Sequence, residues 1–217
     1  MELVIPGLYA SAPGELPFAT SLDIRAFLLR RDRGNLLVYS APAVEADVDA
    51  IEALGGVSRQ YLNHWHEASF GCERTATTFG ATLLCHERDA PSVDGKCTVD
   101  ETFAERTLVD GDFELIPIPG HTQGATAYLG DSGEHRFLFT GDTVYLHEGE
   151  WAAALLEGSS DRAAYIESLE LIRTLDFDVL VPWAATGGQP NHAFTNRADA
   201  QRRIDAILGR LRRGENH

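Results

Sequence analysis

The sequence contains no apolar run long enough to cross a membrane. A bilayer span takes roughly 20 consecutive apolar residues, and the longest apolar runs of this 217-residue chain, such as DVLVPWAA at 178–185, are far shorter. The first fifteen residues, MELVIPGLYASAPGE, also lack the basic segment and apolar core of a secretory signal. We therefore expect neither membrane insertion nor a secretory signal.

Cysteine is scarce. The chain has three cysteines, Cys72, Cys85 and Cys97, which is an odd number, and their spacing does not match a zinc ribbon. Stable disulfides are typical of oxidising compartments. The sequence therefore predicts reduced thiols in a cytoplasmic protein, with Cys85 as a buried core thiol at the end of a strand.

Basic residues are outnumbered. Eighteen lysines and arginines face 33 aspartates and glutamates, which gives a formal net charge of −15. A field of that sign repels polyphosphates, so it argues against a nucleic-acid partner. The arginines near the C-terminus fit a solvated helix face better than a binding patch. We expect a small-molecule substrate and no nucleic-acid or membrane partner, and homo-oligomers are left open.

Length and composition fit one globular domain. The hydrophobic and charged fractions, 44% and 24%, are close to the averages of globular proteins. A chain of this length can form one substantial core, or at most two small ones. We expect residues 1–217 to form a single domain.

Both halves of the chain alternate strands with helices. The pattern predicts strands at 23–30, 35–40, 59–64, 81–86, 113–120, 125–130, 136–142 and 177–183. It predicts helices at 41–56, 72–80, 160–175 and 195–211, the third capped by Ser159 or Ser160. Residues 91–102 read as an irregular polar connection. This order favours a layered α/β architecture with helices covering packed sheets.

Two histidines lie at the end of the predicted strand 59–64. If the chain stays extended, His64 and His66 point to one side, and Trp65 and Glu67 point to the other. Two imidazoles on one side of a strand end can share a cation. Any His-x-His pair satisfies this condition, so ordinary polar histidines are the alternative.

Two further polar residues follow strands. His121 comes after the turn at Pro119 and Gly120, at the mouth of a sheet, where binding groups tend to lie. Asp142 follows a buried strand and Gly141. Taken singly, His121 reads equally well as an exposed turn histidine, and Asp142 as a turn cap.

The three fragments together resemble the metallo-β-lactamase superfamily. They are His-x-His at 64–66, Pro-Gly-His-Thr at 119–122 and Thr-Gly-Asp-Thr at 140–143, each after a strand and in this order. The opening VIPGLY and the order of strands and helices extend the resemblance over nearly the whole chain. It implies a four-layer αββα sandwich of two mixed β-sheets flanked by helices, with the site at one sheet edge.

The chain departs from the family in three places. Members usually carry His-x-His-x-Asp-His and a later Pro-x-His, and here Ala68, Ser69 and Ala184 stand at the positions of the last three ligands. In the family, these three missing ligands bind one of the two metals, and the aspartate of the Gly-Asp-Thr motif binds both. The resemblance therefore implies at most one metal, with these ligands: His64, His66, His121 and Asp142.

Three imidazoles form a complete protein ligand set for a catalytic zinc, which leaves a fourth position for water. Zinc lowers the pKa of that water to about 7. Asp142 would complete the shell or accept a hydrogen bond from the water, so it is also the candidate catalytic residue. Glu67 is disfavoured as a substitute for the missing aspartate, because in extended geometry it points away from His64.

Three functions are compatible with these residues. The first is a zinc hydrolase of an ester, thioester or amide-type bond in a small molecule. The second is a mononuclear iron oxygenase, since His64, His121 and Asp142 resemble a two-histidine, one-carboxylate set, and persulfide dioxygenases of this superfamily use a comparable one. The third is a non-catalytic binding protein on a degenerate, metal-free fold.

The segment after Asp142 is expected to wall the pocket. It carries Tyr145, Leu146 and Trp151, which would suit an apolar group of the substrate. His192 is expected to be an exposed loop histidine, and the role of His147 is left open.

Overall fold

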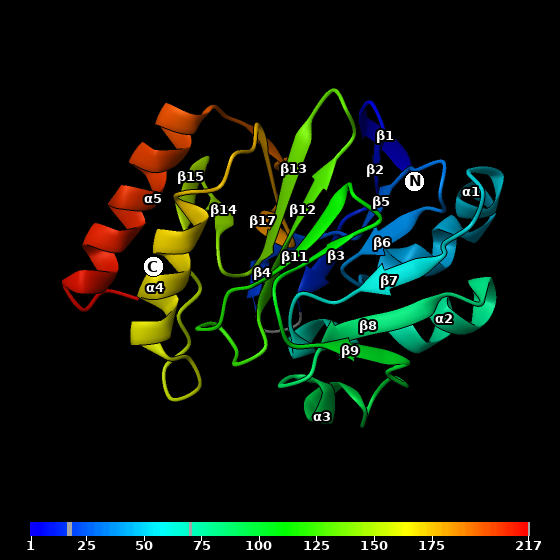
Figure 1. Cartoon of the computed structure of the whole chain (residues 1–217), viewed down its shortest axis with the longest axis horizontal. Coiled ribbons are helices and arrows are strands. Elements are labelled where there is room, and N and C mark those ends of the chain that lie inside the picture. Colours follow the sequence, from blue (N-terminus) through cyan, green and yellow to red (C-terminus); the bar gives the residue numbers. More distant parts are fainter. Residues whose placement is uncertain (17–18, 70, 217) are drawn as a thin grey trace. The chain divides into compact units, whose positions relative to one another are not determined.

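The computed structural model describes residues 1–16, 19–69 and 71–216, and it comprises two compact units. Unit 1 is Met1–Ala104 and unit 2 is Glu105–His217. Each is described by itself (Figure 1), and the single domain expected over 1–217 stays a prediction. Among the described residues, no helix combines the length and apolarity that a membrane span requires.

Unit 1 is built on a seven-stranded mixed sheet in the order β1-β2-β5-β6-β7-β8-β9. Its strands are β1 (Glu2–Ile5), β2 (Leu8–Ala10), β5 (Phe27–Leu29), β6 (Leu36–Val38), β7 (Arg59–Tyr61), β8 (Thr82–His86) and β9 (Glu101–Phe103). Neighbours from β6 to β9 are parallel. A hairpin of β3 (Gly14–Leu16) and β4 (Ala19–Ile24) also belongs to this unit.

Helical segments connect the parallel strands of unit 1, because a parallel pair needs a crossover rather than a tight turn. They are η1 (Pro42–Asp47), α1 (Val48–Ala53), η2 (Trp65–Ser69), α2 (Cys72–Phe79) and α3 (Ala90–Val93). Strands β5 and β6 are buried along their whole length. Ile51 of α1 packs with Leu28 and Leu37 in one apolar cluster, so this side of the helix faces the core.

Unit 2 is built on a six-stranded sheet in the order β10-β11-β12-β13-β16-β18. Its strands are β10 (Thr107–Val109), β11 (Phe113–Pro117), β12 (Thr126–Asp131), β13 (Arg136–Gly141), β16 (Val179–Pro182) and β18 (Ala193–Phe194). Strand β14 (Tyr145–His147) pairs with β15 (Glu150–Ala152) and β17 (Ala184–Thr186). Helices α4 (Arg162–Ile172) and α5 (Arg197–Arg212) lie side by side (Figure 1).

The core of unit 2 lies against these two helices. Apolar residues of both helices pack with buried residues of β11, β12, β13 and β16 in one cluster. Ile204, Ile207, Leu208 and Leu211 are almost fully buried, as the helical spacing of the sequence predicts. The helix expected at 160–175 begins later than expected. Its N-cap is Asp161, whose carboxylate accepts the N–H groups of Ala163 and Ala164.

Two sequence-based expectations about loops are wrong. The connection at 91–102 is not wholly irregular, because α3 overlaps its start and β9 its end. Leu146 and Trp151, which were expected to wall the pocket, are buried in the apolar cluster of unit 2, and the ring of Trp151 stacks on Phe177. Tyr145 is half-buried. The hairpin of β14 and β15 turns these side chains inward, which residue spacing alone could not reveal.

The expectation of reduced cysteines is wrong for one pair. Cys72 at the start of α2 and Cys97 form a disulfide, with Cα atoms 6.2 Å apart. Cys85 is free and buried, as expected of a core thiol. Two neighbouring contacts join the same segments: Lys96 lies over the Trp65 ring, and Glu73 accepts the N–H of Thr98. The cysteines therefore no longer argue for a cytoplasmic location.

Removing the disulfide is expected to lower the free energy of unfolding by about 3 kcal/mol, because it closes a loop of 25 residues in the unfolded chain. Urea unfolding of the variant Cys72→Ser/Cys97→Ser measures this. A thiol reductant should lower the wild-type midpoint toward that of the variant and leave the variant unchanged. An equal response of both proteins to the reductant would contradict the cross-link.

Candidate metal centre

His64 and His66 lie on a tight helical turn of unit 1. Strand β7 ends at Tyr61 and η2 begins at Trp65, so the extended geometry expected from the sequence is wrong. Two carboxylates accept the backbone N–H groups of the turn: Glu67 takes those of Asn63 and His64, and Asp89 takes that of Trp65. Such partners satisfy N–H groups that a helix start leaves unpaired. The two imidazole centroids are nevertheless only 5.0 Å apart.

The hydrogen bonds of His64 define which ring nitrogen can bind a metal. Its Nδ1 lies 2.9 Å from Asn63 Oδ1 and 3.1 Å from Glu67 Oε1. Both partners accept hydrogen bonds, so we assign the ring proton to Nδ1 and the lone pair to Nε2. Glu67 therefore lies on the His64 side, contrary to the expectation from extended geometry. Its fully buried carboxylate orients this histidine.

The loop that carries His121 is held by α4 and the two residues before it in unit 2. The three consecutive carbonyl groups of residues 119–121 each accept a hydrogen bond from this region. The donors, in order, are Ser168 Oγ at 2.7 Å, Asp161 N at 2.9 Å and Ser160 Oγ at 3.0 Å. These three hydrogen bonds hold the backbone of His121 and of the two residues before it.

His121 is buried and held in the same tautomer. Its Nδ1 is 2.6 Å from the carbonyl oxygen of Ala154, which can only accept, so Nδ1 carries the proton and Nε2 the lone pair. That Nε2 lies 3.8 Å from Oδ2 of Asp142. The side chain of Asp142 is 15% exposed. Within unit 2, an imidazole lone pair and a carboxylate thus lie close enough to face one cation.

Tyr165 of α4 links the two segments behind His121 and Asp142. Its buried hydroxyl donates to the carbonyl of Thr143 at 2.7 Å and accepts the N–H of Ala154 at 3.1 Å. Burial raises the pKa of this hydroxyl well above its usual value, so it stays a neutral donor. Sequence reasoning missed Tyr165. The available signal was a tyrosine on the apolar face of a helix, since a buried hydroxyl needs a partner.

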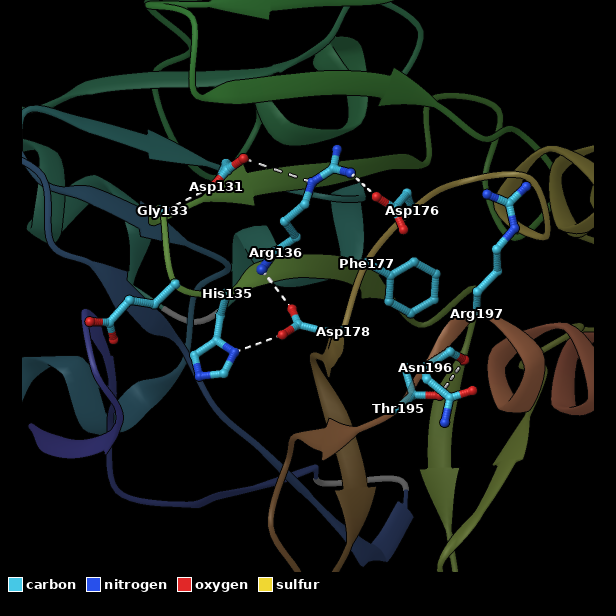
Figure 2. A pocket seen from close by; sticks show the side chains of 11 residues that line it. Asp131, Gly133, His135, Arg136, Asp176, Phe177, Asp178, Thr195, Asn196 and Arg197 are labelled. Atoms are coloured by element: carbon cyan, nitrogen blue, oxygen red, sulfur yellow. Dashed lines mark hydrogen bonds and ion pairs between the residues drawn. The ribbon is translucent and has the colours of Figure 1, made fainter.

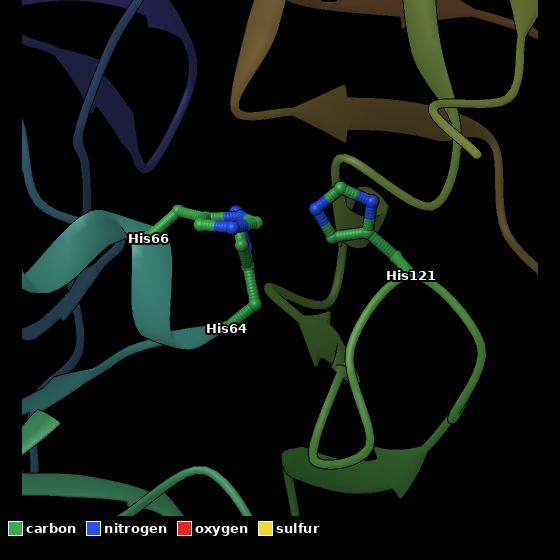
Figure 3. Close-up of side chains that lie close together, drawn as sticks. All are labelled: His64, His66 and His121. Carbon is green, nitrogen blue, oxygen red and sulfur yellow. The ribbon is translucent and has the colours of Figure 1, made fainter. Parts of the chain in front are cut away.

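Among the described residues, a group of three histidines could hold a metal ion: His64, His66 and His121. Figure 3 shows His66 on η2, His64 on the segment just before it, and His121 on the loop after β11. The donor set fits a cation, because two of the imidazoles direct their Nδ1 protons to acceptors and therefore carry the lone pair on Nε2.

Two of the three positions of the missing ligands are occupied by buried alanines. Ala68 packs with Leu62, Cys72 and Cys97 in an apolar cluster, and Ala184 is buried in β17. Neither methyl group offers a ligand atom, and a carboxylate at 68 would be buried among apolar groups at considerable cost. The side chain of Ser69 lies outside the described part of the structure.

Four further side chains carry atoms that can bind a metal: Cys85, His86, His147 and His192. Burial, with Asp89, Asp94 and Glu67 adding to it, raises the pKa of the Cys85 thiol to about 12, so it is not a thiolate at neutral pH. In unit 1, both ring nitrogens of His86 have backbone partners, Ala104 O and Arg88 N. His147 is exposed, and His192 is only partly exposed.

A separate pocket of about 440 Å³ opens on unit 2 (Figure 2). Several of its ionisable side chains pair with one another: Arg136 Nη1 is 2.6 Å from Asp176, and Asp178 accepts the N–H of Arg136 and lies 2.7 Å from His135 Nδ1. Neither His121 nor Asp142 lines it. We therefore assign it to the structural support of this end of the sheet rather than to the metal centre.

Comparison with known proteins points to one family. Residues 39–184 match the model of the metallo-beta-lactamase superfamily. A hydroxyacylglutathione hydrolase of Pectobacterium atrosepticum is 31% identical over 144 residues, which are 66% of this chain and 47% of that protein. A second, from Pectobacterium carotovorum, is 29% identical over 143 residues with the same shares. The chain thus spans about half the length of the curated relatives it matches.

Solved structures show the same fold. A metallo-beta-lactamase from Pontibacter korlensis superposes with a TM-score of 0.72 at 18% identity, covering 96% of each chain. ETHE1 from Myxococcus xanthus superposes with a TM-score of 0.63 at 19% identity, covering 86% of this chain and 80% of that one. At these identities the likeness concerns the fold alone, and it confirms the predicted α/β class with mixed sheets and helices.

Proposed function

The chain belongs to the metallo-β-lactamase superfamily. We propose that it is a metal-dependent hydrolase of an ester, thioester or amide-type bond in a small molecule. Its preferred substrate is a thioester. One observation carries the proposal. His64 and His121 are both buried, and each directs its Nδ1 proton to an oxygen acceptor. Histidines whose Nδ1 proton is donated to an oxygen acceptor are typical of metal sites.

The residues that would hold the metal are His64, His66 and His121, with Asp142 as fourth ligand or as partner of the attacking water. A single zinc ion fits this set of nitrogen and oxygen donors, and when bound it would supply Lewis acidity and a water activated at neutral pH. The alanines at 68 and 184 argue against a second ion.

Side chains of the protein would orient the attacking water and hold the site in place. A carboxylate oxygen of Asp142 would accept a hydrogen bond from the attacking water and so fix its orientation. Tyr165 would keep the backbone of residues 142–143 in place by donating to the carbonyl of Thr143. The three donors from residues 160, 161 and 168 would hold the His121 loop still during turnover.

The thioester preference comes from the curated relatives. Both are hydroxyacylglutathione hydrolases by name, and an acyl group on the glutathione sulfur is a thioester. The chain covers only 47% of the first of them, so its own acyl and thiol groups need not be theirs. A thioester needs no protonation of its leaving group at neutral pH, since a thiolate leaves readily. This suits a site whose one assigned acid–base residue is Asp142.

Metal content and thiol release together test the proposal. Protein purified without a metal-binding tag should contain about one zinc per chain. The zinc-loaded protein should release free thiol from a hydroxyacylglutathione, detected with a thiol reagent, faster than it cleaves the matching oxygen ester. Two zinc equivalents would contradict the single site. Iron with oxygen consumption would favour the oxygenase, and absence of both metal and hydrolysis would favour a binding protein.

A further inference from the structure

Glu67 occupies an unusual position for an acidic residue. It stands between the candidate ligand His66 and the buried Ala68, and its side chain is fully buried. One oxygen, Oε1, faces three nitrogens: Asn63 N at 3.1 Å, His64 N at 3.3 Å and His64 Nδ1 at 3.1 Å. The same carboxylate therefore caps the turn and contacts the ring of a candidate ligand.

We propose that Glu67 is a positioning residue of the metal centre. Its carboxylate holds His64 with Nε2 presented for ligation, and its negative charge acts through the imidazole on the bound cation. This inference rests on the proposed function, because it concerns the same centre. It adds a residue that lies on the far side of the ring from the ligand atom and so is not itself a ligand.

The cost of burying a charge supports this role. A carboxylate is removed from water only at considerable expense unless a positive partner compensates it. Capping two backbone N–H groups does not require a charge, because a neutral amide or hydroxyl accepts them equally well. The imidazole of His64 lies 3.1 Å from Glu67 Oε1. A cation on the other nitrogen of that ring would place a positive charge on the side of the carboxylate that faces His64.

The contact also has the geometry that strengthens a ligand. A carboxylate that accepts the Nδ1 proton of a metal-bound imidazole fixes its orientation and increases the electron density at Nε2. Asn63 Oδ1 shares the same proton at 2.9 Å, but it carries no charge. With alanine at 68, Glu67 is the residue of the 63–68 turn that supplies negative charge.

Zinc affinities of four proteins test the role. Metal-free wild type, Glu67→Gln, the double variant Glu67→Gln/Asn63→Asp and Asp100→Asn are titrated with zinc against a chromophoric chelator. Glutamine keeps an acceptor in place but removes the charge, so Glu67→Gln should bind zinc about 10- to 100-fold more weakly. The double variant returns a carboxylate to the same ring nitrogen, and its affinity should recover to within a few-fold of wild type.

Asp100 provides the matched control. Its carboxylate also accepts a backbone N–H in unit 1, that of Leu83 at 2.7 Å. Asp100 lies just before β9 and not on the turn that carries His64 and His66. Asp100→Asn should leave zinc affinity unchanged. Equal affinity of Glu67→Gln and wild type would overturn the proposal, and so would a loss that Asn63→Asp does not restore, because that result indicates a merely structural role.

The two proposals fail in different ways. If the wild type binds zinc but releases no thiol from any thioester, the hydrolase is rejected while the affinity series still decides on Glu67. If thiol release occurs and Glu67→Gln binds zinc normally, Glu67 is rejected alone. Should Glu67→Gln not fold, the double variant decides: an affinity near that of wild type supports the role, and a loss of tenfold or more rejects it. A wild type that takes up no zinc rejects both.

Discussion

Replacing His121 with alanine is expected to abolish metal binding and hydrolysis while leaving a folded protein. The substitution removes one of the three imidazoles. Losing only the hydrogen-bond partner of a metal ligand weakens metal binding by up to about 100-fold. Losing a ligand itself should therefore weaken zinc binding by more than that. It also leaves the carbonyl of Ala154 without its 2.6 Å bond. That loss should lower the free energy of unfolding by about 1–3 kcal/mol.

The control is His147→Ala in the same unit. His147 is exposed and does not belong to the three-histidine group, so metal content, hydrolysis and stability should all stay at wild-type values. Zinc is measured by elemental analysis, turnover by thiol release and stability by urea unfolding of the metal-free proteins. Wild-type zinc content in the His121 variant would remove this residue from the centre.

Replacing Gly120 with alanine is expected to have the largest effect on stability. The glycine has a φ of +144°, which side chains rarely adopt, and a Cβ built on it would lie 2.6 Å from the backbone nitrogen of Tyr165. Backbone atoms of a helix cannot move aside as the end of a flexible side chain can. The variant should lose more than about 3 kcal/mol of unfolding free energy, and it should also displace His121.

Gly149→Ala is the matched control for backbone conformation. Gly149 also has a positive φ, +83°, but a Cβ there meets nothing within 4 Å. Its cost should be limited to backbone strain, about 1–2 kcal/mol. The difference between the two variants in urea unfolding then measures the close approach of Gly120 to α4. Similar stabilities for both would show that this approach is not tight.

Much of the fold could be predicted because it depends on local patterns. Strands such as Phe113–Pro117 and Arg136–Gly141 are runs of residues with high strand propensity, and α5 carries an apolar stripe at helical spacing. The strand–turn positions of His121 and Asp142 follow from the same patterns. The missing ligands could also be read directly, since Ala68 and Ala184 have no atom that binds a metal.

The turn at His64 could not be predicted in this way. Spacing suggested an extended chain with Glu67 turned away, whereas Asp89 and Glu67 close a helical turn and bring Glu67 against His64. Asp89 lies 24 residues beyond Trp65, so no local pattern contains the contact. The pairing of Cys72 with Cys97 and the inward turn of Trp151 are of the same kind.

The sequence by itself determined most of the core strands and helices, the family, and which side chains are candidates to bind a metal. These depend on side-chain chemistry and on periodicity, and both can be read from short stretches of the sequence. The tertiary structure decided which nitrogen of His64 and of His121 carries the proton. That choice depends on acceptors at Glu67 and Ala154, the second of them 33 residues from its histidine. Only folding brings such partners within hydrogen-bonding distance, and the tautomer they impose defines the atom that can bind a metal.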